Sequence, residues 1–227
     1  KEGWRIAVSM IYGYTKDREL AWKIIEKLGL CNEQESKVQF TMADRKINAV
    51  ISTSVGRLFD AVSAILGIRR QSSFEGEASM ALEFAAEAYE QQNIMQGRDE
   101  KPDRLVYEKE ERFILNTRML VQQIVEEKMQ GADSGRLAYL FHQVLAEQIT
   151  AACIEALSNS GRKKVALSGG VFQNRLLLRL TEEQLEQEGF EVLRHHMIPP
   201  NDGGIAIGQA AYGMWRLNNH GLQDRRI

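Results

Sequence analysis

The last third of the chain carries the pattern that most limits what it can fold into. Two short apolar runs of strand length alternate with two segments of helical periodicity, and a glycine turn stands before each helical segment. In chain order these segments are 163–167, 168–170, 171–187, 189–193, 201–204 and 205–216. An order of strand, helix, strand and helix predicts an α/β fold with a small parallel or mixed sheet flanked by helices.

The rest of the chain predicts helices. Apolar residues recur there at three- and four-residue spacing, and the expected helices span 4–30 (two helices), 33–47, 56–66, 75–92, 120–129 and 134–158. Ser54 suits the N-cap of helix 56–66, and Gly67 suits its end. The alanine-rich helix 75–92 should be buried on one side, and the polar stretch 97–104 predicts a loop.

Composition excludes several classes of function. A chain of 227 residues with 44% apolar content can bury a substantial core. Its formal charge of −2 arises from 29 basic and 31 acidic residues spread along the chain, so we expect neither nucleic acid nor a membrane as a partner. No apolar stretch approaches 18 residues and no signal-peptide pattern opens the sequence, which predicts a cytoplasmic protein.

Two further features concern the chain as a whole. Cys31 and Cys153 are too few for a disulfide framework or a Cys-x-x-Cys metal site, and we interpret both as core residues. The sequence begins with Lys1 inside an amphipathic pattern, so we interpret it as a fragment of a longer protein.

The first glycine turn, Ser168-Gly169-Gly170, lies between a predicted strand and a predicted helix. Backbone N–H groups at a helix amino terminus suit a phosphate or an adenosine. The turn matches neither the dinucleotide fingerprint nor a P-loop, so a plain tight turn is an equal alternative. Asn174, one turn later, could reach the same ligand or could be an exposed polar residue of the helix.

The second turn, Asn201-Asp202-Gly203-Gly204, follows a rigid Pro199-Pro200 pair. Asp202 could simply be an N-cap. If both turns face one nucleotide, however, Asp202 stands near a phosphate, and two like charges 4 Å apart repel by about 4 kcal/mol at an effective dielectric of about 20. A cation between them removes the conflict, which makes Asp202 a candidate metal ligand.

Other polar residues allow a functional and a structural interpretation. Asp60, in the first turn of a helix, could accept both hydroxyls of a ribose, although its spacing alone favours an interaction with the helix dipole. Arg57 could bind an anion, or could pair with Asp60 or another surface acid. His195 and His196 are adjacent on a probable strand and should point to opposite faces, which favours structural roles. No catalytic triad can be assembled, so the catalytic residues are not identified.

Four blocks, taken together and in this order, resemble the final part of HypF-type hydrogenase-maturation carbamoyltransferases. The blocks are Gly56-Arg57-Leu58-Phe59-Asp60-Ala61, Phe74-Glu75-Gly76-Glu77-Ala78, Ser168-Gly169-Gly170-Val171-Phe172-Gln173-Asn174 and Pro199-Pro200-Asn201-Asp202-Gly203-Gly204-Ile205-Ala206-Ile207-Gly208-Gln209. They cover residues 52 to 210 well. The resemblance implies the second lobe of an actin-like ATPase fold. We therefore expect a helical leading segment over residues 1–50 and one nucleotide-binding lobe over residues 51–227, with the first lobe and the upstream domains absent.

The resemblance also implies the residues that hold the nucleotide. In the family the Ser-Gly-Gly turn cradles ATP or the carbamoyl-adenylate. The residues of this chain that correspond to the turn are Gly169, Gly170 and Asn174. An aspartate that holds the ribose maps onto Asp60, with the Gly76 turn beside it.

The implied metal site and reaction follow from the same resemblance. The aspartate that completes a divalent metal site maps onto Asp202, and Mg²⁺, Fe²⁺ or Zn²⁺ are all admissible. The family's reaction starts from carbamoyl phosphate and ATP, passes through carbamoyl-adenylate and carbamoylates a cysteine of a partner maturation protein. That product becomes the cyanide ligand of a nickel–iron hydrogenase. Because this chain lacks the histidine pair of the first lobe, we expect it to be inactive alone.

Other functions remain open at this point. Enzymes that make threonylcarbamoyl-adenosine in tRNA and antibiotic O-carbamoyltransferases share the fold. The tRNA-modifying relatives carry a Tyr-Pro-Gly-Gly-Pro-like turn where this chain has 74–78, and the acidic version favours hydrogenase maturation. A noncatalytic helical interaction module is the alternative from a different class, and it predicts no ATP binding.

Overall fold

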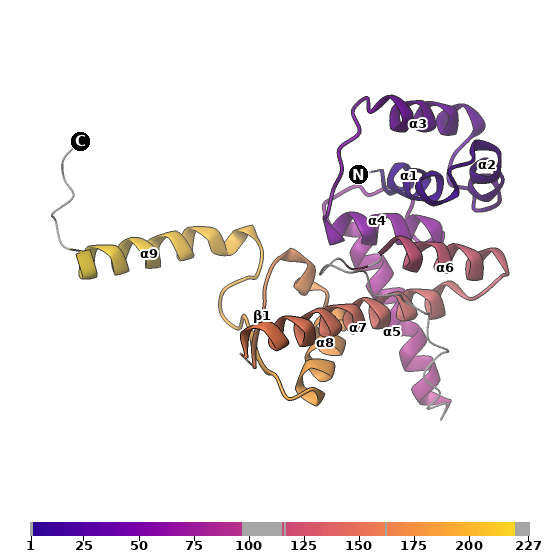
Figure 1. Ribbon diagram of the computed structural model, residues 1–227. Coiled ribbons are helices and arrows are strands. Elements are labelled where there is room, and N and C mark those ends of the chain that lie inside the picture. The colour runs from indigo at the N-terminus through magenta and orange to yellow at the C-terminus, as the bar shows by residue number, and fades with distance from the viewer. Residues whose placement is uncertain (1, 97–114, 116, 162, 221–227) are drawn as a thin grey trace, which may run out of the picture.

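The computed structural model describes residues 2–96, 115, 117–161 and 163–220, and Figure 1 shows how the elements are arranged. Helices dominate this part of the chain. They are α1 Gly3–Thr15, α2 Arg18–Lys27, α3 Glu33–Arg45, α4 Val55–Ile65, α5 Glu77–Met95, α6 Thr117–Met129, α7 Ser134–Ser160, α8 Arg175–Gln187 and α9 Ile205–His220. Strands β1 Lys164–Leu167 and β2 Glu191–Arg194 and the short 3₁₀ turns η1 Gly170–Gln173 and η2 Asp202–Gly204 complete the fold.

Local sequence explains where several helices begin and end. The Asp133 carboxylate accepts a hydrogen bond from the Arg136 N–H at 2.8 Å and so caps α7. Gly67 ends α4 in the left-handed conformation, with φ of 73°, as predicted. Ser54 occupies the predicted N-cap position of α4, but its side chain makes no capping hydrogen bond.

One hydrophobic core joins α1–α3 to α4–α8. Helix α5 packs along α7, and α1 packs along α4. Trp4, Ile11, Phe59 and Phe141 are among the largest side chains that this core buries completely. This core includes residues from both sides of residue 50. The domain boundary predicted between residues 50 and 51 stays a prediction.

The sheet consists of β1 and β2, which pair in parallel with Lys164 opposite Glu191 and Leu167 opposite Arg194. Helix α8 forms the crossover between them, and Leu167, Leu185 and Phe190 fill a small second core beneath the sheet. The predicted α/β, helix-rich architecture is confirmed, and the sheet in the described part of the chain is parallel rather than mixed.

The boundaries of the second strand and of the helix before it differ from the prediction. The helix expected from residue 171 begins at Arg175, because η1 comes first and Asn174 caps α8. The strand expected over 189–193 lies at 191–194, because Gly189 and Phe190 still close the end of α8. His195 and His196 therefore follow the strand, and their predicted position on it is wrong. The predicted loop at 97–104 lies outside the described residues.

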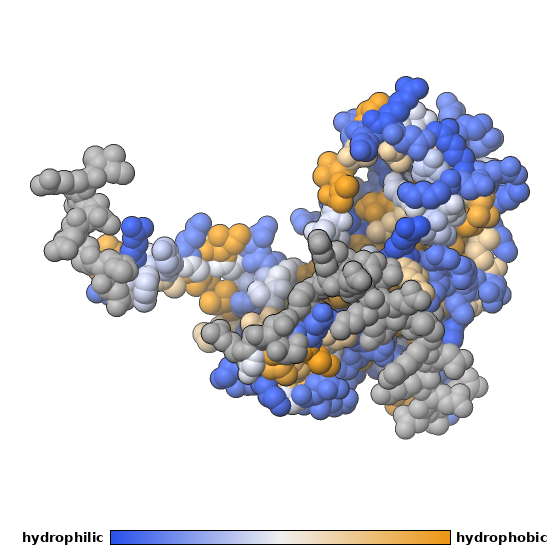
Figure 2. All heavy atoms as spheres, viewed as in Figure 1, coloured by the Kyte–Doolittle hydropathy of each residue, from blue (hydrophilic) through white to orange (hydrophobic). Residues whose placement is uncertain are grey.

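Helix α9 leaves the body of the molecule, as Figure 1 shows. Apolar side chains stand exposed along it in Figure 2. Those with half or more of their surface exposed are Ile205, Ile207, Tyr212, Met214, Trp215 and Leu217. No helix among the described residues is both long enough and apolar enough to cross a bilayer.

Candidate functional site

The two glycine turns meet at the carboxyl edge of the sheet. The Gly169 N–H donates a hydrogen bond of 2.9 Å to the Pro200 carbonyl oxygen, which ties the turn after β1 to the turn after β2. A Cβ placed on Gly170 would stand 3.9 Å from Cβ of Asn201. Two segments that are far apart in sequence therefore form one surface, at the edge where ligands bind in open parallel sheets.

A side-chain contact joins the same two segments. Ser168 Oγ and His195 Nε2 are 2.9 Å apart and hydrogen-bonded, and both residues are exposed. Alternation along a strand suggested only a structural role for His195, and its pairing with Ser168 was missed. The signal that could have found it is position, because each residue is the first to follow one of two parallel strands.

The first turn leaves two backbone donors free. The Phe172 N–H donates to the Gly169 carbonyl and the Asn174 N–H donates to the Val171 carbonyl, each at 3.1 Å, so η1 is closed on itself. The N–H groups of Gly170 and Val171 have no acceptor within the part of the chain that the structure describes. Two adjacent free N–H groups in an exposed turn can donate to phosphate oxygens.

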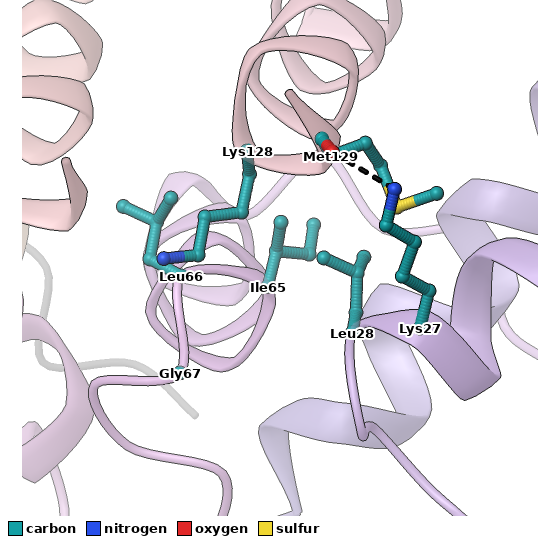
Figure 3. A pocket seen from close by; sticks show the side chains of 7 residues that line it. All are labelled: Lys27, Leu28, Ile65, Leu66, Gly67, Lys128 and Met129. Carbon is teal, nitrogen blue, oxygen red and sulfur yellow. Dashed lines mark hydrogen bonds between the residues drawn. The ribbon is translucent and has the colours of Figure 1, made fainter. Parts of the chain in front are cut away.

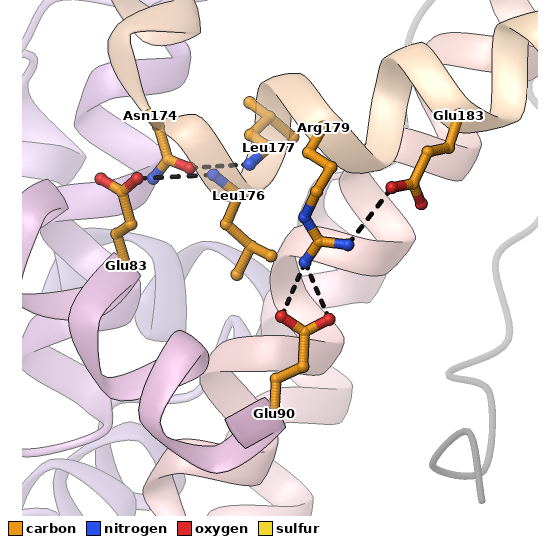
Figure 4. Close-up of polar contacts among 7 residues, drawn as sticks. All are labelled: Glu83, Glu90, Asn174, Leu176, Leu177, Arg179 and Glu183. Atoms are coloured by element: carbon orange, nitrogen blue, oxygen red, sulfur yellow. Dashed lines mark hydrogen bonds and ion pairs between the residues drawn. The ribbon is translucent and has the colours of Figure 1, made fainter. Parts of the chain in front are cut away.

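The amino terminus of α8, in contrast, is already occupied. Glu83 of α5 accepts hydrogen bonds from the N–H groups of Arg175 and Leu176, at 2.6 and 3.4 Å. Figure 4 shows this carboxylate beside Asn174 at the start of the helix. Burial raises the pKa of Glu83, and the two N–H donors oppose that shift. The carboxyl group of Glu83 thus already accepts from the first N–H groups of α8, so a phosphate would have to use the turn rather than the helix.

Asn174 lies in the interior rather than at the surface. Its Oδ1 accepts a hydrogen bond of 2.8 Å from the Leu177 N–H, and its Nδ2 lies 3.0 Å from His142 Nε2. Only 7% of its surface is exposed. Both ends of the amide are therefore engaged inside the protein, and a direct contact between Asn174 and a nucleotide stays a prediction.

Asp202 begins the second turn with its carboxylate exposed. The N-cap of this turn is Asn201, whose Oδ1 accepts from the Gly203 N–H at 3.0 Å, so Asp202 is not needed for capping. No hydrogen bond or ion pair of the Asp202 side chain occurs within the described residues, and no three acidic, histidine or cysteine side chains cluster there as a metal site. This chain can offer a cation one free carboxylate at the turn.

Gly204 lets the second turn fold tightly. A Cβ at this position would stand 2.7 Å from the Pro199 carbonyl oxygen, which is closer than real Cβ contacts allow. Only glycine fits there without moving the turn.

Asp60 is half-buried on α4 and pairs with Arg57, whose guanidinium lies 3.3 Å from the carboxylate. Burial raises the pKa of Asp60, and the Arg57 charge acts against this shift. One of the two predicted interpretations of Arg57, pairing with Asp60, is thus realised. Helix α4 also packs against η1, which brings the helix of Asp60 to the first glycine turn.

Gly76 precedes α5. It is the N-cap of α5 and adopts φ of 83°, a conformation that favours glycine. No hydrogen bond within the described part of the chain joins it to either turn. Its predicted place beside the nucleotide stays a prediction.

A separate pocket of about 200 Å³ lies where α2, α4 and α6 end. Figure 3 shows the two lysines that line it, Lys27 and Lys128. Lys27 Nζ donates to the Met129 carbonyl at 2.9 Å, and Lys128 Nζ donates to Ser134 Oγ at 2.6 Å. Both ammonium groups lie near the carboxyl ends of helices, where a positive charge interacts favourably with the helix dipole.

Comparison with known proteins gives consistent matches. The family model described as "Carbamoyltransferase, Kae1-like Domain, second subdomain" matches residues 1–209. The probable carbamoyltransferase HypF of Methanocaldococcus jannaschii is 27% identical over 205 residues, which are 90% of this chain and 25% of that protein. The carbamoyltransferase HypF homolog of Cupriavidus necator is 29% identical over 214 residues, which are 92% of this chain and 52% of that protein.

A solved structure is similar over almost the whole chain. It is a crystal structure of full-length HypF in a phosphate- and nucleotide-bound form, with a TM-score of 0.80 and 32% identity. The match covers 96% of this chain and 27% of that one. The chain thus spans between a quarter and about half of the length of these relatives.

Proposed function

Because the chain belongs to the family of the second subdomain of the Kae1-like carbamoyltransferase domain, we propose that it forms the nucleotide-binding half of an ATP-dependent carbamoyltransferase site. In this proposal the whole protein makes carbamoyl-adenylate from carbamoyl phosphate and ATP. A cysteine thiolate of a hydrogenase-maturation partner then attacks the carbamoyl carbon, a C–S bond forms, and AMP leaves with the electrons of the broken C–O bond.

One observation carries the proposal, namely the hydrogen bond from Gly169 to Pro200 that joins the two turns. It sets the free N–H groups of Gly170 and Val171 beside the turn that carries Asp202. N–H donors that already point at the phosphate before the reaction stabilise the charge that develops on the leaving AMP. They do so without having to reorganise during the reaction. The nucleotide in the similar full-length structure supports a nucleotide here as well.

The residues present fit a divalent cation in part. A phosphate at Gly170 would repel the Asp202 carboxylate, and a cation shared by the two would reverse that interaction. When bound, the cation would neutralise phosphate charge. Asp202 would hold it from this chain, and further ligands would have to come from outside the described residues.

Asp60 is proposed to accept the ribose hydroxyls. It has to be ionised to accept both, and the neighbouring Arg57 favours the ionised form against the effect of burial. Its position on a helix that packs against η1 supports a ribose next to the first turn.

Nucleotide titration of the full-length protein tests the proposal. Gly170→Val adds a branched side chain beside Asn201 and should weaken ATP binding at least about tenfold. Asp60→Ala should weaken it to a similar extent. Gly13→Ala, in α1 with open space around the new methyl group, is the matched control and should bind as the wild type does. Absence of ATP binding in every protein would favour the interaction module instead.

The metal is tested separately by Asp202→Ala in the full-length enzyme. Carbamoylation of the cysteine should be abolished, whereas hydrolysis of carbamoyl phosphate should persist, because hydrolysis does not need the nucleotide turn. Loss of both activities together would show that Asp202 is required for folding and would contradict its role as a ligand.

A further inference from the structure

His142 of α7 is a buried polar side chain that contacts Asn174, beside the first glycine turn. None of its surface is exposed. Nδ1 lies 2.7 Å from the Ala138 carbonyl oxygen, and Nε2 lies 3.0 Å from Nδ2 of Asn174. Both ring nitrogens are therefore hydrogen-bonded. His142 and Asn174 are 32 positions apart in the sequence.

The partners define the roles of the two ring nitrogens. A carbonyl oxygen can only accept, so Nδ1 carries the proton and Nε2 is left as an acceptor. Asn174 uses its Oδ1 to accept from the Leu177 N–H, and so its Nδ2 is the end that donates to the ring. The neutral histidine and the amide fit in this one arrangement only.

Asn174 transmits this arrangement to the glycine turn. Its own N–H closes η1 on the Val171 carbonyl at 3.1 Å, and its side chain caps α8. Whatever fixes Asn174 therefore fixes the residue that caps the end of η1, the turn that carries the free N–H groups of Gly170 and Val171.

The ring of His142 also contacts the helix that carries Asp60. The His142 and Phe59 rings meet edge to face, with centroids 5.3 Å apart and planes at 75°. Phe59 is only 2% exposed and is the residue immediately before Asp60 on α4. His142 therefore contacts both of the segments that are expected to hold the nucleotide.

We propose that His142 is a positioning residue of the nucleotide site, which holds Asn174 and the η1 turn at a fixed place relative to Asp60. The proposal rests on the proposed function, since it assumes that a nucleotide binds between η1 and α4. His142 contacts no ligand itself. A histidine that merely fills the core would affect the stability of the fold and leave the affinity of the folded protein for ATP unchanged.

Three variants of the full-length protein separate these possibilities. His142→Phe keeps a ring but removes both hydrogen bonds. His142→Gln retains an amide oxygen that can accept from Asn174. Asn174→Ser retains a good N-cap for α8 but is too short to reach the histidine. The measurements are the dissociation constant of ATP by calorimetry and the midpoint of thermal unfolding.

We expect His142→Phe and Asn174→Ser to weaken ATP binding by about tenfold each, and His142→Gln by no more than about threefold. The double variant His142→Phe with Asn174→Ser should bind no more weakly than either single variant, because both changes break the same hydrogen bond.

If His142→Phe and Asn174→Ser bind ATP with unchanged affinity and show only a lower unfolding midpoint, the inference is overturned. Fully additive losses in the double variant would overturn it as well, because they would place the two effects on separate contacts. If His142→Phe fails to fold, Asn174→Ser and His142→Gln still decide between these results. A wild-type protein that binds no ATP would instead overturn the proposed function, and this inference with it.

Discussion

Gly3 lies so close to Asp60 that a Cβ on Gly3 would stand 2.5 Å from the Asp60 carbonyl oxygen. The first turn of α1 thus packs directly on the backbone of α4, the helix that carries Asp60, the residue expected to bind the ribose. Any side chain at Gly3 has to move α1 away from α4, because a backbone carbonyl in a helix cannot turn aside alone.

Gly3→Ala should therefore destabilise the protein by about 2 kcal/mol, the usual cost of overpacking a core. Chemical denaturation measures this cost. Gly13→Ala in the same helix meets nothing within 4 Å and should be neutral or stabilising, by up to about 1 kcal/mol. Equal effects of the two substitutions would contradict close packing at Gly3.

The second glycine turn offers another matched pair. An alanine at Gly204 would collide with the Pro199 carbonyl, whereas Gly208 has open space. Gly204→Ala should open the turn and speed hydrogen exchange at the amides of Gly169 and Gly204, which donate to Pro200 and Asn201. Exchange at these amides should stay unchanged in Gly208→Ala. Slow exchange in both variants would argue against the tight contact.

His142 should make the fold sensitive to acid. Burial lowers the pKa of His142 from 6.5 to about 4, and the two ring nitrogens are hydrogen-bonded to uncharged groups, the Ala138 carbonyl and the Asn174 amide. Above pH 6.5 the folded and unfolded states are both neutral at this residue, and the contribution to stability is complete. As the pH falls toward 4, the unfolded state binds a proton that the folded state does not bind, so stability decreases by roughly 3 kcal/mol.

The variant His142→Gln isolates this effect from the titration of the carboxylates. Denaturation at pH 7.5, 6 and 4.5 should show a steeper loss of stability in the wild type than in His142→Gln. Parallel losses in the two proteins would mean that His142 binds its proton at a similar pH in both states.

The ion pair between α5 and α8 should be measurable but modest. Figure 4 shows Arg179 between Glu90 and Glu183, and one guanidinium nitrogen lies 2.8 and 2.6 Å from the two Glu90 oxygens. A double-mutant cycle on Arg179 and Glu90 should give a coupling of about 1 kcal/mol, since Glu90 is mostly buried. The exposed pair Lys23 and Glu19 should give a weaker coupling, because water and salt screen both of its charges. A larger coupling in the exposed pair would reverse this ranking.

Much of the fold follows from short-range patterns. Apolar spacing predicts the helices, and the alternation of strand, turn and helix predicts the parallel sheet. Where the prediction is wrong, two signals compete. The apolar residues Val171 and Phe172 continue the helical period of α8 backward, but Asn174 caps the helix and leaves them in a 3₁₀ turn.

The candidate site could be predicted less completely. The two glycine turns and Asp60 are local motifs, and a resemblance can identify them. The contacts that organise them are not local. Glu83 reaches the start of α8 from 92 residues away, and His142 reaches Asn174 from 32 residues away. Neither residue belongs to a motif, and a lone buried histidine or glutamate has the same appearance in a sequence whatever it contacts.

Helix α9 has a consequence for anyone who handles this polypeptide on its own. Between Ile205 and Trp215 nearly every residue is apolar or small, with Gln209 as the exception, so no side of the helix prefers water. Such a surface lowers colloidal stability. We expect the purified chain to elute from a sizing column at an apparent mass that rises with loading concentration, and mild non-ionic detergent should reverse the rise.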